Sequence, residues 1–421
     1  MNIRELLRGK FAVDSAWLLI AYTVVAFSGI LINFILGHYY GPDAVGVFNQ
    51  AYSLFQIFAM LGAMGINFST VKHVAEKKSD SNEVKKIFST SQVLTFTISL
   101  LFSLSIITAI SVFPFLMSSD NVRRATILIT VSLPFFVTNK NQWAYYIGLR
   151  RMREYSMFRL LRWVSILCIV SIWALLKLSM VYAVVAFLVS DIILSVYLHI
   201  RNSGAFAFSA ADRRWAVTHI NFGYKSILTE VLSSVYSRLP ILLIGYFLGD
   251  SDAGMYSIAA TMASGILIIA SIMQDNFNPL VANLHSAGDT ELLEGYVKKL
   301  KKFSLLSLVP LIITSVILYK IYIFFLGSQY KGTSTIFYIL LTGVGLSYLV
   351  SWAGGVLTMT VNQMLNLLRI LITLVITTAG CVILVPAKGV TGAAMAFSLS
   401  SVVNMVMLYF FILRRTKIKI L

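Results

Sequence analysis

The chain has 421 residues, of which 58% are hydrophobic and 12% are charged. Soluble domains carry about 25% charged residues, so this composition excludes the soluble globular class. The net charge is +17, but the basic residues fall in short clusters between long apolar runs. That pattern is typical of membrane topology signals rather than of a nucleic-acid-binding surface. We therefore expect an all-α integral membrane protein without a nucleic-acid partner.

The apolar runs predict about twelve transmembrane helices, each long enough to cross a hydrocarbon core of roughly 30 Å. The first run is longer than the apolar region of a cleavable signal peptide, so it is expected to be retained as a helix. In chain order the predicted spans are 13–36, 47–70, 88–115, 125–148, 157–176, 180–200, 226–248, 254–274, 303–326, 334–358, 365–386 and 390–413.

The distribution of basic residues predicts the orientation of these spans. With the N-terminus in the cytoplasm, 26 of the 34 Lys and Arg residues fall in or beside cytoplasmic segments, five fall outside and three lie within spans. This asymmetry follows the positive-inside rule and places both termini in the cytoplasm. The longest connections, 201–225 and 276–302, are then also cytoplasmic. The second mixes Leu and Val with four lysines, which indicates an amphipathic helix lying on anionic membrane lipids.

A glycine tract after the first span recurs after the seventh at a constant offset of 208 residues. A second pair of tracts, at 183–190 and 393–400, repeats at an offset of 210. These matches predict two parallel six-helix halves in a V-shaped alternating-access bundle. The N-terminal half is expected over 1–200, a cytoplasmic linker over 201–225 and the C-terminal half over 226–421. The aligned residues of the first tract are Gly37, Gly41, Gly46 and Ala51, with Gly245, Gly249, Gly254 and Ala259.

Polar residues interrupt the fourth predicted span at Thr138–Gln142, which contains Lys140 between Asn139 and Asn141. The apolar run before it, 125–137, rises only about 20 Å as a helix, too little to span the membrane. The tract is therefore expected within the span, where a charge needs a partner or a watery cavity. Either a substrate cavity or a polar contact between helices satisfies this requirement.

Other charges are expected within or near the membrane. Arg238 lies in the seventh span, two residues before Pro240, and is expected to contact substrate or to pair with another helix, with Asp191 as a possible partner. Lys320 lies near the outer end of the ninth span, where its stem can reach the interface. Three carboxylates are candidates for ion coupling or for pairing with basic residues: Asp14, Asp191 and Glu230.

Lys140 and Arg238 fall in opposite halves at similar depth. Two cations facing one cavity suit an anionic head group such as a pyrophosphate. The sequence thus predicts a substrate-binding set of Lys140, Arg238, Asn139, Asn141 and Lys320.

Several tracts resemble a known group of transporters. The most similar are LGHYYGPDAVGVFNQAYSL, after the first span, and RLPILLIGYFLGDSDAGMYSIA, across the seventh and eighth; VAEKKSD and LVANLHSAGD also fit. With twelve spans in two halves, the chain resembles the Wzx-type O-antigen flippases of the multidrug/oligosaccharidyl-lipid/polysaccharide exporter superfamily. The resemblance covers nearly the whole chain.

The resemblance implies a function and a set of partners. Such proteins move an undecaprenyl-pyrophosphate-linked oligosaccharide from the cytoplasmic to the periplasmic leaflet of the bacterial inner membrane by alternating access. The head group passes through a cavity with basic residues, which Lys140 and Arg238 match in type and depth. A polysaccharide polymerase and a chain-length regulator are expected partners. Flipping requires no covalent chemistry, so no catalytic residue or cofactor is expected.

Other functions remain open at this point. A drug or cation antiporter of the same superfamily is one alternative, although its cavity would favour acidic residues. A membrane glycosyltransferase or polysaccharide polymerase is another, and the D-x-D of Asp250 and Asp252 is its one sequence feature. A passive structural membrane protein is a third. No Walker motif occurs, the five histidines are scattered, and Cys168 and Cys381 lie apart in apolar segments, so neither ATP, a metal nor a disulfide is expected.

Overall fold

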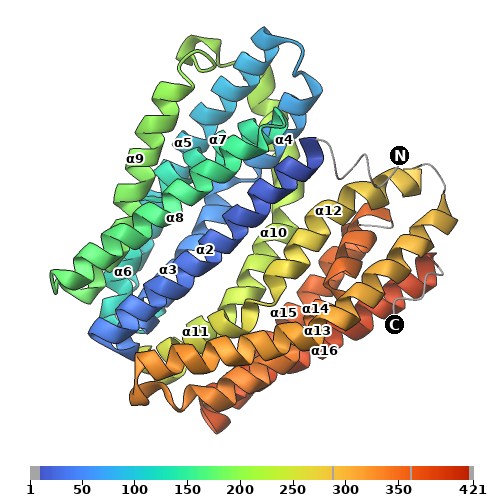
Figure 1. Ribbon diagram of the computed structural model, residues 1–421. Helices are drawn as coiled ribbons and strands as arrows, with labels where there is room; N and C mark the ends of the chain where they lie inside the picture. Colours follow the sequence, from blue (N-terminus) through green and yellow to red (C-terminus); the bar gives the residue numbers. More distant parts are fainter. Residues whose placement is uncertain (1–9, 287–288, 361–362, 417–421) are drawn as a thin grey trace. The chain divides into compact units, whose positions relative to one another are not determined.

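The computed structural model describes residues 10–286, 289–360 and 363–416. Over these residues the regular secondary structure is helical, with no strand (Figure 1). This confirms the predicted all-α class. The charged ends of the chain, which include Arg4, Arg8, Lys417 and Lys419, lie outside the described residues.

The chain divides into two compact units. Unit 1 comprises residues 1–40 and 47–234, and unit 2 comprises 41–46 and 235–421. The boundary at 234/235 lies inside one long helix, α10, so this helix contributes its first part to unit 1 and its last part to unit 2.

Unit 1 is a helical bundle in which α2 packs along α8, and α7 packs against α4, α5 and α9 (Figure 1). Short 3₁₀ turns join some of these helices, such as η2 (Met180–Val184) before α9. The helices are α2 (Lys10–Tyr40), α3 (Pro42–Ala63), α4 (Ile66–Glu76), α5 (Ser81–Val112), α6 (Asp120–Thr130), α7 (Leu133–Gly148), α8 (Met152–Leu175), α9 (Val185–Arg201) and α10 (Arg213–Leu248).

Unit 2 is centred on α14 and α16. The helix α16 packs against α14 and α15, and α14 also packs against α11, α12 and α13. The remaining helices are α11 (Asp250–Ser264), α12 (Leu267–Ser286), α13 (Thr290–Leu326), α14 (Thr333–Thr360), α15 (Gln363–Lys388) and α16 (Val390–Thr416).

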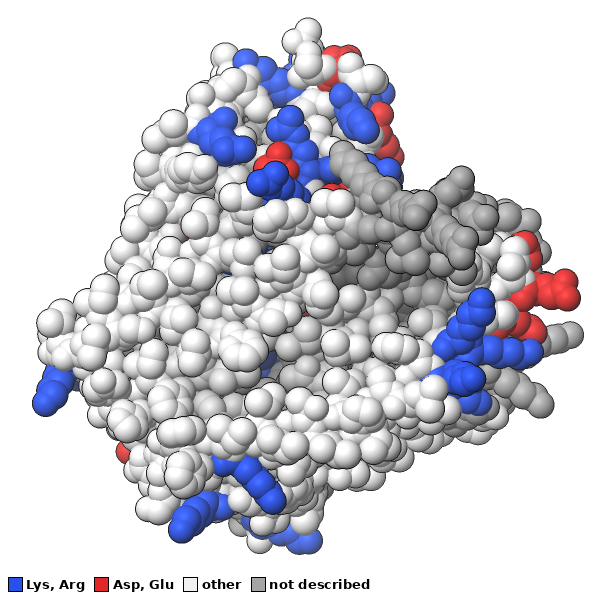
Figure 2. All heavy atoms as spheres, in the orientation of Figure 1, with Lys and Arg blue, Asp and Glu red and all other residues white. Residues whose placement is uncertain are grey.

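The protein is a multi-pass membrane protein. Among the described residues, ten helices are long and apolar enough to cross a membrane, and an eleventh span arises if α11 and the start of α12, bent by 50°, count as one. The predicted span 125–148 differs from a single helix, because the chain breaks at Val131–Ser132 and restarts with Pro134 in the first turn of α7. On the face in Figure 2, Lys and Arg gather near helix ends and leave the apolar sides between them almost uncharged.

The amphipathic segment predicted within 276–302 is not a separate helix. Its second part forms the first turns of the 37-residue helix α13. Leu293 and Val297 are buried against Trp352 and Val356 of α14, while Lys298 and Lys299 are exposed. The alternation of apolar and basic residues therefore reflects packing onto unit 2, which the sequence pattern alone does not distinguish from packing onto lipid.

The repeated glycines form a reciprocal contact in unit 2. A Cβ atom on Gly46 would lie 1.8 Å from the backbone oxygen of Asp250, and one on Gly254 would lie 2.0 Å from the backbone oxygen of Pro42. Residues 42 and 250 are themselves separated by the repeat offset of 208. The N-terminal turns of α3 and α11 thus cross at backbone contact, which only glycine permits, and the contact has the reciprocity of a two-fold repeat.

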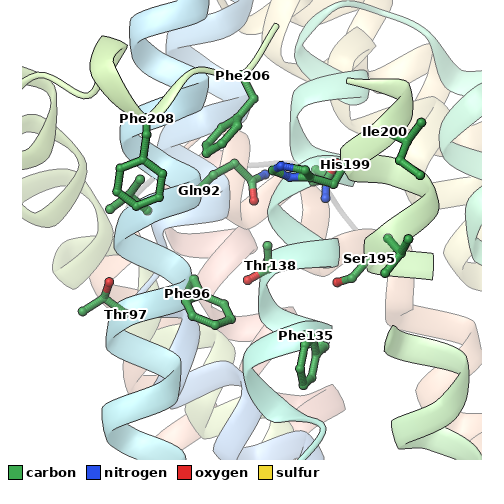
Figure 3. Close-up of a pocket in the computed structure, with 13 residues that line it drawn as sticks. Gln92, Phe96, Thr97, Phe135, Thr138, Ser195, His199, Ile200, Phe206 and Phe208 are labelled. Atoms are coloured by element: carbon green, nitrogen blue, oxygen red, sulfur yellow. The ribbon is translucent and has the colours of Figure 1, made fainter. Parts of the chain in front are cut away.

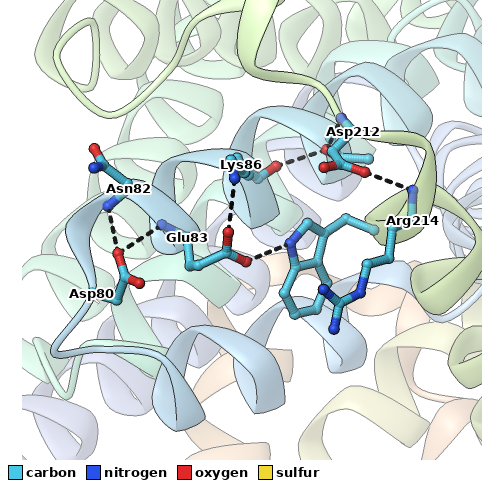
Figure 4. A network of polar contacts seen from close by, with 8 residues as sticks. Asp80, Asn82, Glu83, Lys86, Asp212 and Arg214 are labelled. Carbon is cyan, nitrogen blue, oxygen red and sulfur yellow. Dashed lines mark hydrogen bonds and ion pairs between the residues drawn. The ribbon is translucent and has the colours of Figure 1, made fainter.

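The segment 201–225 belongs to unit 1 and packs against α5 through a series of polar contacts. The backbone nitrogens of Ala207 and Asp212 donate to Ser89 and Thr90 of α5, and Trp215 Nε1 donates to Glu83 Oε2 at 3.0 Å. Figure 4 shows the last contact with the neighbouring ion pair of Glu83 and Lys86, 2.9 Å apart. These contacts fix the segment 206–215 on the end of α5.

His219 extends this anchor into the interior of unit 1. Its Nδ1 lies 2.8 Å from Ser69 Oγ, and its Nε2 lies 3.2 Å from the backbone oxygen of Ile87. Burial lowers the pKa of His219 to about 4, so the imidazole is neutral at pH 7. The first turns of α10 are therefore part of the core of unit 1.

Candidate functional site

Lys140 forms an ion pair with one of the carboxylates named from the sequence. Its Nζ lies 3.7 Å from Glu230 Oε1 of α10 and 3.2 Å from Met60 Sδ of α3. The side chains of Lys140 and Glu230 are 17% and 34% exposed. The pair is therefore long and only partly buried, unlike a tightly packed structural salt bridge, and both groups remain accessible to a ligand.

The neighbours of Lys140 hold helices together. Asn139 donates to the backbone oxygen of Asp191 at 2.9 Å and accepts from Ser195, both on α9. Asn141 donates to Ser91 of α5 and accepts from Thr70 of α4, each at 2.8 Å. Both asparagines are 0% exposed. The polar tract thus divides: Asn139 and Asn141 are fully buried in helix–helix contacts, whereas Lys140 is 17% exposed beside Glu230.

Asp191 has a partner that the sequence did not indicate. Arg162 of α8 forms a two-pronged contact with it, Nε to Oδ1 at 2.6 Å and Nη2 to Oδ2 at 2.9 Å. The two side chains are 2% and 0% exposed, and the guanidinium lies 4.3 Å from the ring centre of Phe136. This closed arrangement is structural, because neither group has a face left for an ion or a substrate.

The sequence contains a signal for this pair, because Arg162 lies within the predicted span 157–176. The positive-inside rule assigns it to the basic cytoplasmic residues around 150–162, since it lies near the end of that span. A basic residue six positions inside a span needs a partner just as Lys140 does.

Unit 2 contains the predicted cation Arg238 and a second cation in a candidate span, Arg369. Arg238 is half-buried on α10, and its Nη1 donates to Ser237 at 2.9 Å. Arg369 of α15 donates through Nη2 to Asn366 Oδ1 at 2.8 Å and through Nη1 to Asn404 Oδ1 of α16. Its described partners are thus neutral amides, and no described carboxylate forms an ion pair with it.

Arg369 lies near the start of the predicted span 365–386, where the positive-inside rule reads a basic residue as part of a cytoplasmic connection. In the structure Arg369 lies in the candidate span Met364–Lys388 and is half-buried beside Asn366 and Asn404. A guanidinium held by neutral acceptors keeps its full positive charge, which suits the binding of an anion.

The remaining predicted residues lie apart from these groups. Lys320 is exposed near the C-terminal end of α13, where it lines a hollow of about 320 Å³ with Lys331 and Tyr338. Asp14 is half-buried in the first turns of α2. No group of three or more His, Cys, Asp or Glu residues suited to a metal occurs among the described residues.

Comparison with known proteins identifies the family. The sequence model of the family described as "Polysaccharide biosynthesis protein" matches residues 11–285, about two thirds of the chain. The chain belongs to this family. No curated protein matches the chain by sequence.

The fold of this family member is that of the multidrug/oligosaccharidyl-lipid/polysaccharide (MOP) superfamily, as the resemblance predicted. An inward-facing multidrug resistance MATE transporter has a TM-score of 0.69 at 14% identity, over 93% of each chain. The lipid II flippase MurJ in an inward closed conformation has a TM-score of 0.70 at 14% identity, over 95% of this chain and 87% of its own. A MOP superfamily transporter from Pyrococcus furiosus has a TM-score of 0.62 at 14% identity, over 97% and 96%.

Proposed function

We propose that this protein is a flippase in the bacterial inner membrane, with both termini in the cytoplasm. It translocates an undecaprenyl-pyrophosphate-linked oligosaccharide, an O-antigen or related polysaccharide repeat unit, by alternating access. The family described for polysaccharide biosynthesis supports the pathway. The shared fold with MurJ, a lipid II flippase, supports the kind of transport. In this proposal the protein carries out no covalent reaction and delivers its product to a polysaccharide polymerase and a chain-length regulator.

The observation that carries this proposal is that Arg369 and Lys140 are not held in tight, buried ion pairs. Arg369 in unit 2 has neutral partners, and Lys140 in unit 1 shares a long ion pair with a partly exposed carboxylate. Charged groups at membrane depth are costly unless they serve a ligand or a partner. A pyrophosphate carries the negative charge that each of these cations can bind, and a guanidinium binds phosphate oxygens through two parallel hydrogen bonds.

Glu230 is a partner that a substrate phosphate can replace at Lys140. With Nζ and Oε1 3.7 Å apart, the contact is weaker than a direct charge-assisted hydrogen bond of about 2.8 Å. In the proposed cycle a substrate phosphate replaces Glu230 as the partner of Lys140, and Glu230 takes the place back after release. Proton or cation uptake by Glu230 during the exchange would couple transport to an ion gradient.

The antiporter alternative requires a carboxylate free to bind a cationic drug. Two of the three carboxylates named from the sequence are paired with cations, Asp191 with Arg162 and Glu230 with Lys140. A cation-binding pocket would lose affinity through these partners. The charge pattern therefore favours an anionic substrate.

The role of the cations is tested in cells that lack the chromosomal gene and carry plasmid-borne variants. Arg369→Met and Lys140→Met are expected to reduce surface polysaccharide by about tenfold or more, the equivalent of one lost charge-assisted hydrogen bond. Arg369→Lys and Lys140→Arg keep the charge and should restore part of the surface polymer. Immunoblotting of membranes shows that each variant accumulates normally.

Lys388→Met is the matched control, because Lys388 is an exposed cation at the other end of α15. Its surface polysaccharide should equal that of the wild type. Normal polysaccharide in the Arg369→Met and Lys140→Met strains at normal protein levels would remove both residues from the substrate path.

A further inference from the structure

Unit 1 contains an apolar groove between α5, α7 and α9, separate from the pair of Lys140 and Glu230. Its volume is about 470 Å³. In Figure 3, Gln92 and His199 extend toward this groove from α5 and α9, above the rings of Phe96 and Phe135. Its walls are mostly hydrocarbon, and their outer members are exposed: Phe96 41%, Val196 55%, Ile200 70% and Phe208 74%.

One polar group in the groove is left without a partner. Gln92 is 6% exposed, and its amide nitrogen has no hydrogen-bond partner among the described residues. Three other polar groups of the groove have partners within unit 1: Thr138 donates to the backbone of Pro134, Ser195 donates to Asn139, and Gln142 accepts from Asn202. Thr97 and His199, which also line the groove, are exposed. Buried donors without an acceptor are rare in folded proteins, so Gln92 points to a ligand that carries an acceptor oxygen.

The groove also has a polar end and an apolar end. Ile200 is followed directly by Arg201, whose guanidinium lies over the ring of Phe158 of α8. Val93 lies seven residues, about 10 Å, beyond Lys86 on α5, and Lys86 pairs with Glu83. The segment that carries Phe206 and Phe208 is fixed on α5 by the bond from Ala207 to Ser89. These two rings lie outside the candidate spans, so the groove runs from the polar ends of α5 and α9 into the apolar part of unit 1.

We propose that this groove binds a glycerophospholipid of the membrane. The acyl chain lies along the wall of Phe96, Phe135 and Val196, the ester carbonyl accepts a hydrogen bond from Gln92, and the phosphate lies at the polar end, beyond the apolar wall. An ester carbonyl is an acceptor without a donor, which matches a buried amide NH₂. This site is independent of the proposed flipping of oligosaccharide.

The test measures binding of dioleoyl phosphatidylglycerol to the purified, delipidated protein by native mass spectrometry. The wild type is expected to bind one molecule with saturation. Gln92→Leu removes the ester contact and should weaken binding about fivefold to tenfold, the equivalent of one hydrogen bond. Val196→Trp fills the groove and should abolish saturable binding. Gln92→Leu is expected to fold, because leucine takes away a donor that has no protein partner.

Ile172→Trp is the matched control, since Ile172 is a 56% exposed aliphatic residue on α8, outside the groove. It should bind phosphatidylglycerol like the wild type. Equal binding by the wild type, Gln92→Leu and Val196→Trp would overturn the proposal. The second contradicting result concerns undecaprenyl phosphate, which has no ester carbonyl. Saturable binding of this lipid that displaces phosphatidylglycerol, is lost in Val196→Trp and is unchanged in Gln92→Leu would also overturn the proposal.

Discussion

The Arg162→Met variant is expected to be destabilised by about 3–5 kcal/mol, because it leaves the Asp191 carboxylate buried without its counter-charge. Arg162 and Asp191 are 2% and 0% exposed, so water cannot replace the lost partner. Asp191→Leu should be destabilised similarly. The double variant Arg162→Met/Asp191→Leu should recover much of the loss, since it removes both charges together. Thermal unfolding of the purified variants in one detergent measures all three.

The control for this experiment is an exposed pair in the same unit. Arg124 of α6 lies 3.0 Å from Asp120, and the two side chains are 61% and 59% exposed. Arg124→Met should shift the unfolding temperature little, because exposed ion pairs are screened by solvent. A double variant no more stable than either single variant would contradict the ion-pair interpretation and would indicate that packing of the two side chains carries the stability.

Gly46→Ala and Gly254→Ala are expected to lower the stability of unit 2 strongly, although each adds only one methyl group. The new Cβ atoms would lie 1.8 Å and 2.0 Å from the backbone oxygens of Asp250 and Pro42. Backbone atoms cannot rotate away as a side chain can, so the ends of α3 and α11 must separate. Overpacking typically costs about 1–3 kcal/mol, and this contact should lie at or above the upper end. The measurement is the unfolding temperature and the yield of folded protein.

Gly29→Ala is the control, because it adds the same methyl group at a position with free space around it. Gly29 lies inside α2, and no atom lies within 4 Å of the position of its added Cβ. Alanine favours a helix interior over glycine by about 1 kcal/mol, so this variant should be equal to or more stable than the wild type. If Gly46→Ala and Gly254→Ala behaved like Gly29→Ala, the close crossing of α3 and α11 would be wrong.

Long apolar runs made the helical fold predictable from the sequence. Each run needs only local hydropathy to be recognised, and most predicted spans coincide with one α-helix. The spans 47–70, 125–148 and 254–274 are each divided into two α-helices, and 180–200 is divided into η2 and α9. The breaks depend on short signals, such as the turn at Val131–Ser132 before Pro134, or Gly65 with its φ of 67° before α4. These signals also occur inside unbroken helices, as Pro240 in α10 shows.

The partners of the buried charges were less predictable. Lys140 and Glu230 were both named from the sequence, but 90 positions separate them and only the packing of α7 near α10 brings them together. The inward-facing positions of Arg162 and Arg369 were not predicted, for a different reason. The positive-inside rule counts basic residues near span ends as topology signals, so it does not separate a solvated arginine from one turned inward toward Asp191 or Asn404.

The central claim is that the protein moves a carrier-linked oligosaccharide from one leaflet to the other, and reconstitution tests it most directly. Purified protein is placed in liposomes that contain an undecaprenyl-pyrophosphate-linked oligosaccharide in both leaflets. A membrane-impermeant reagent that oxidises sugars then reports the accessible fraction over time. The account predicts that the inner-leaflet fraction becomes accessible with the wild type and stays protected with Arg369→Met. If the inner-leaflet fraction stays as protected in liposomes with the wild-type protein as in protein-free liposomes, the proposed flipping is contradicted.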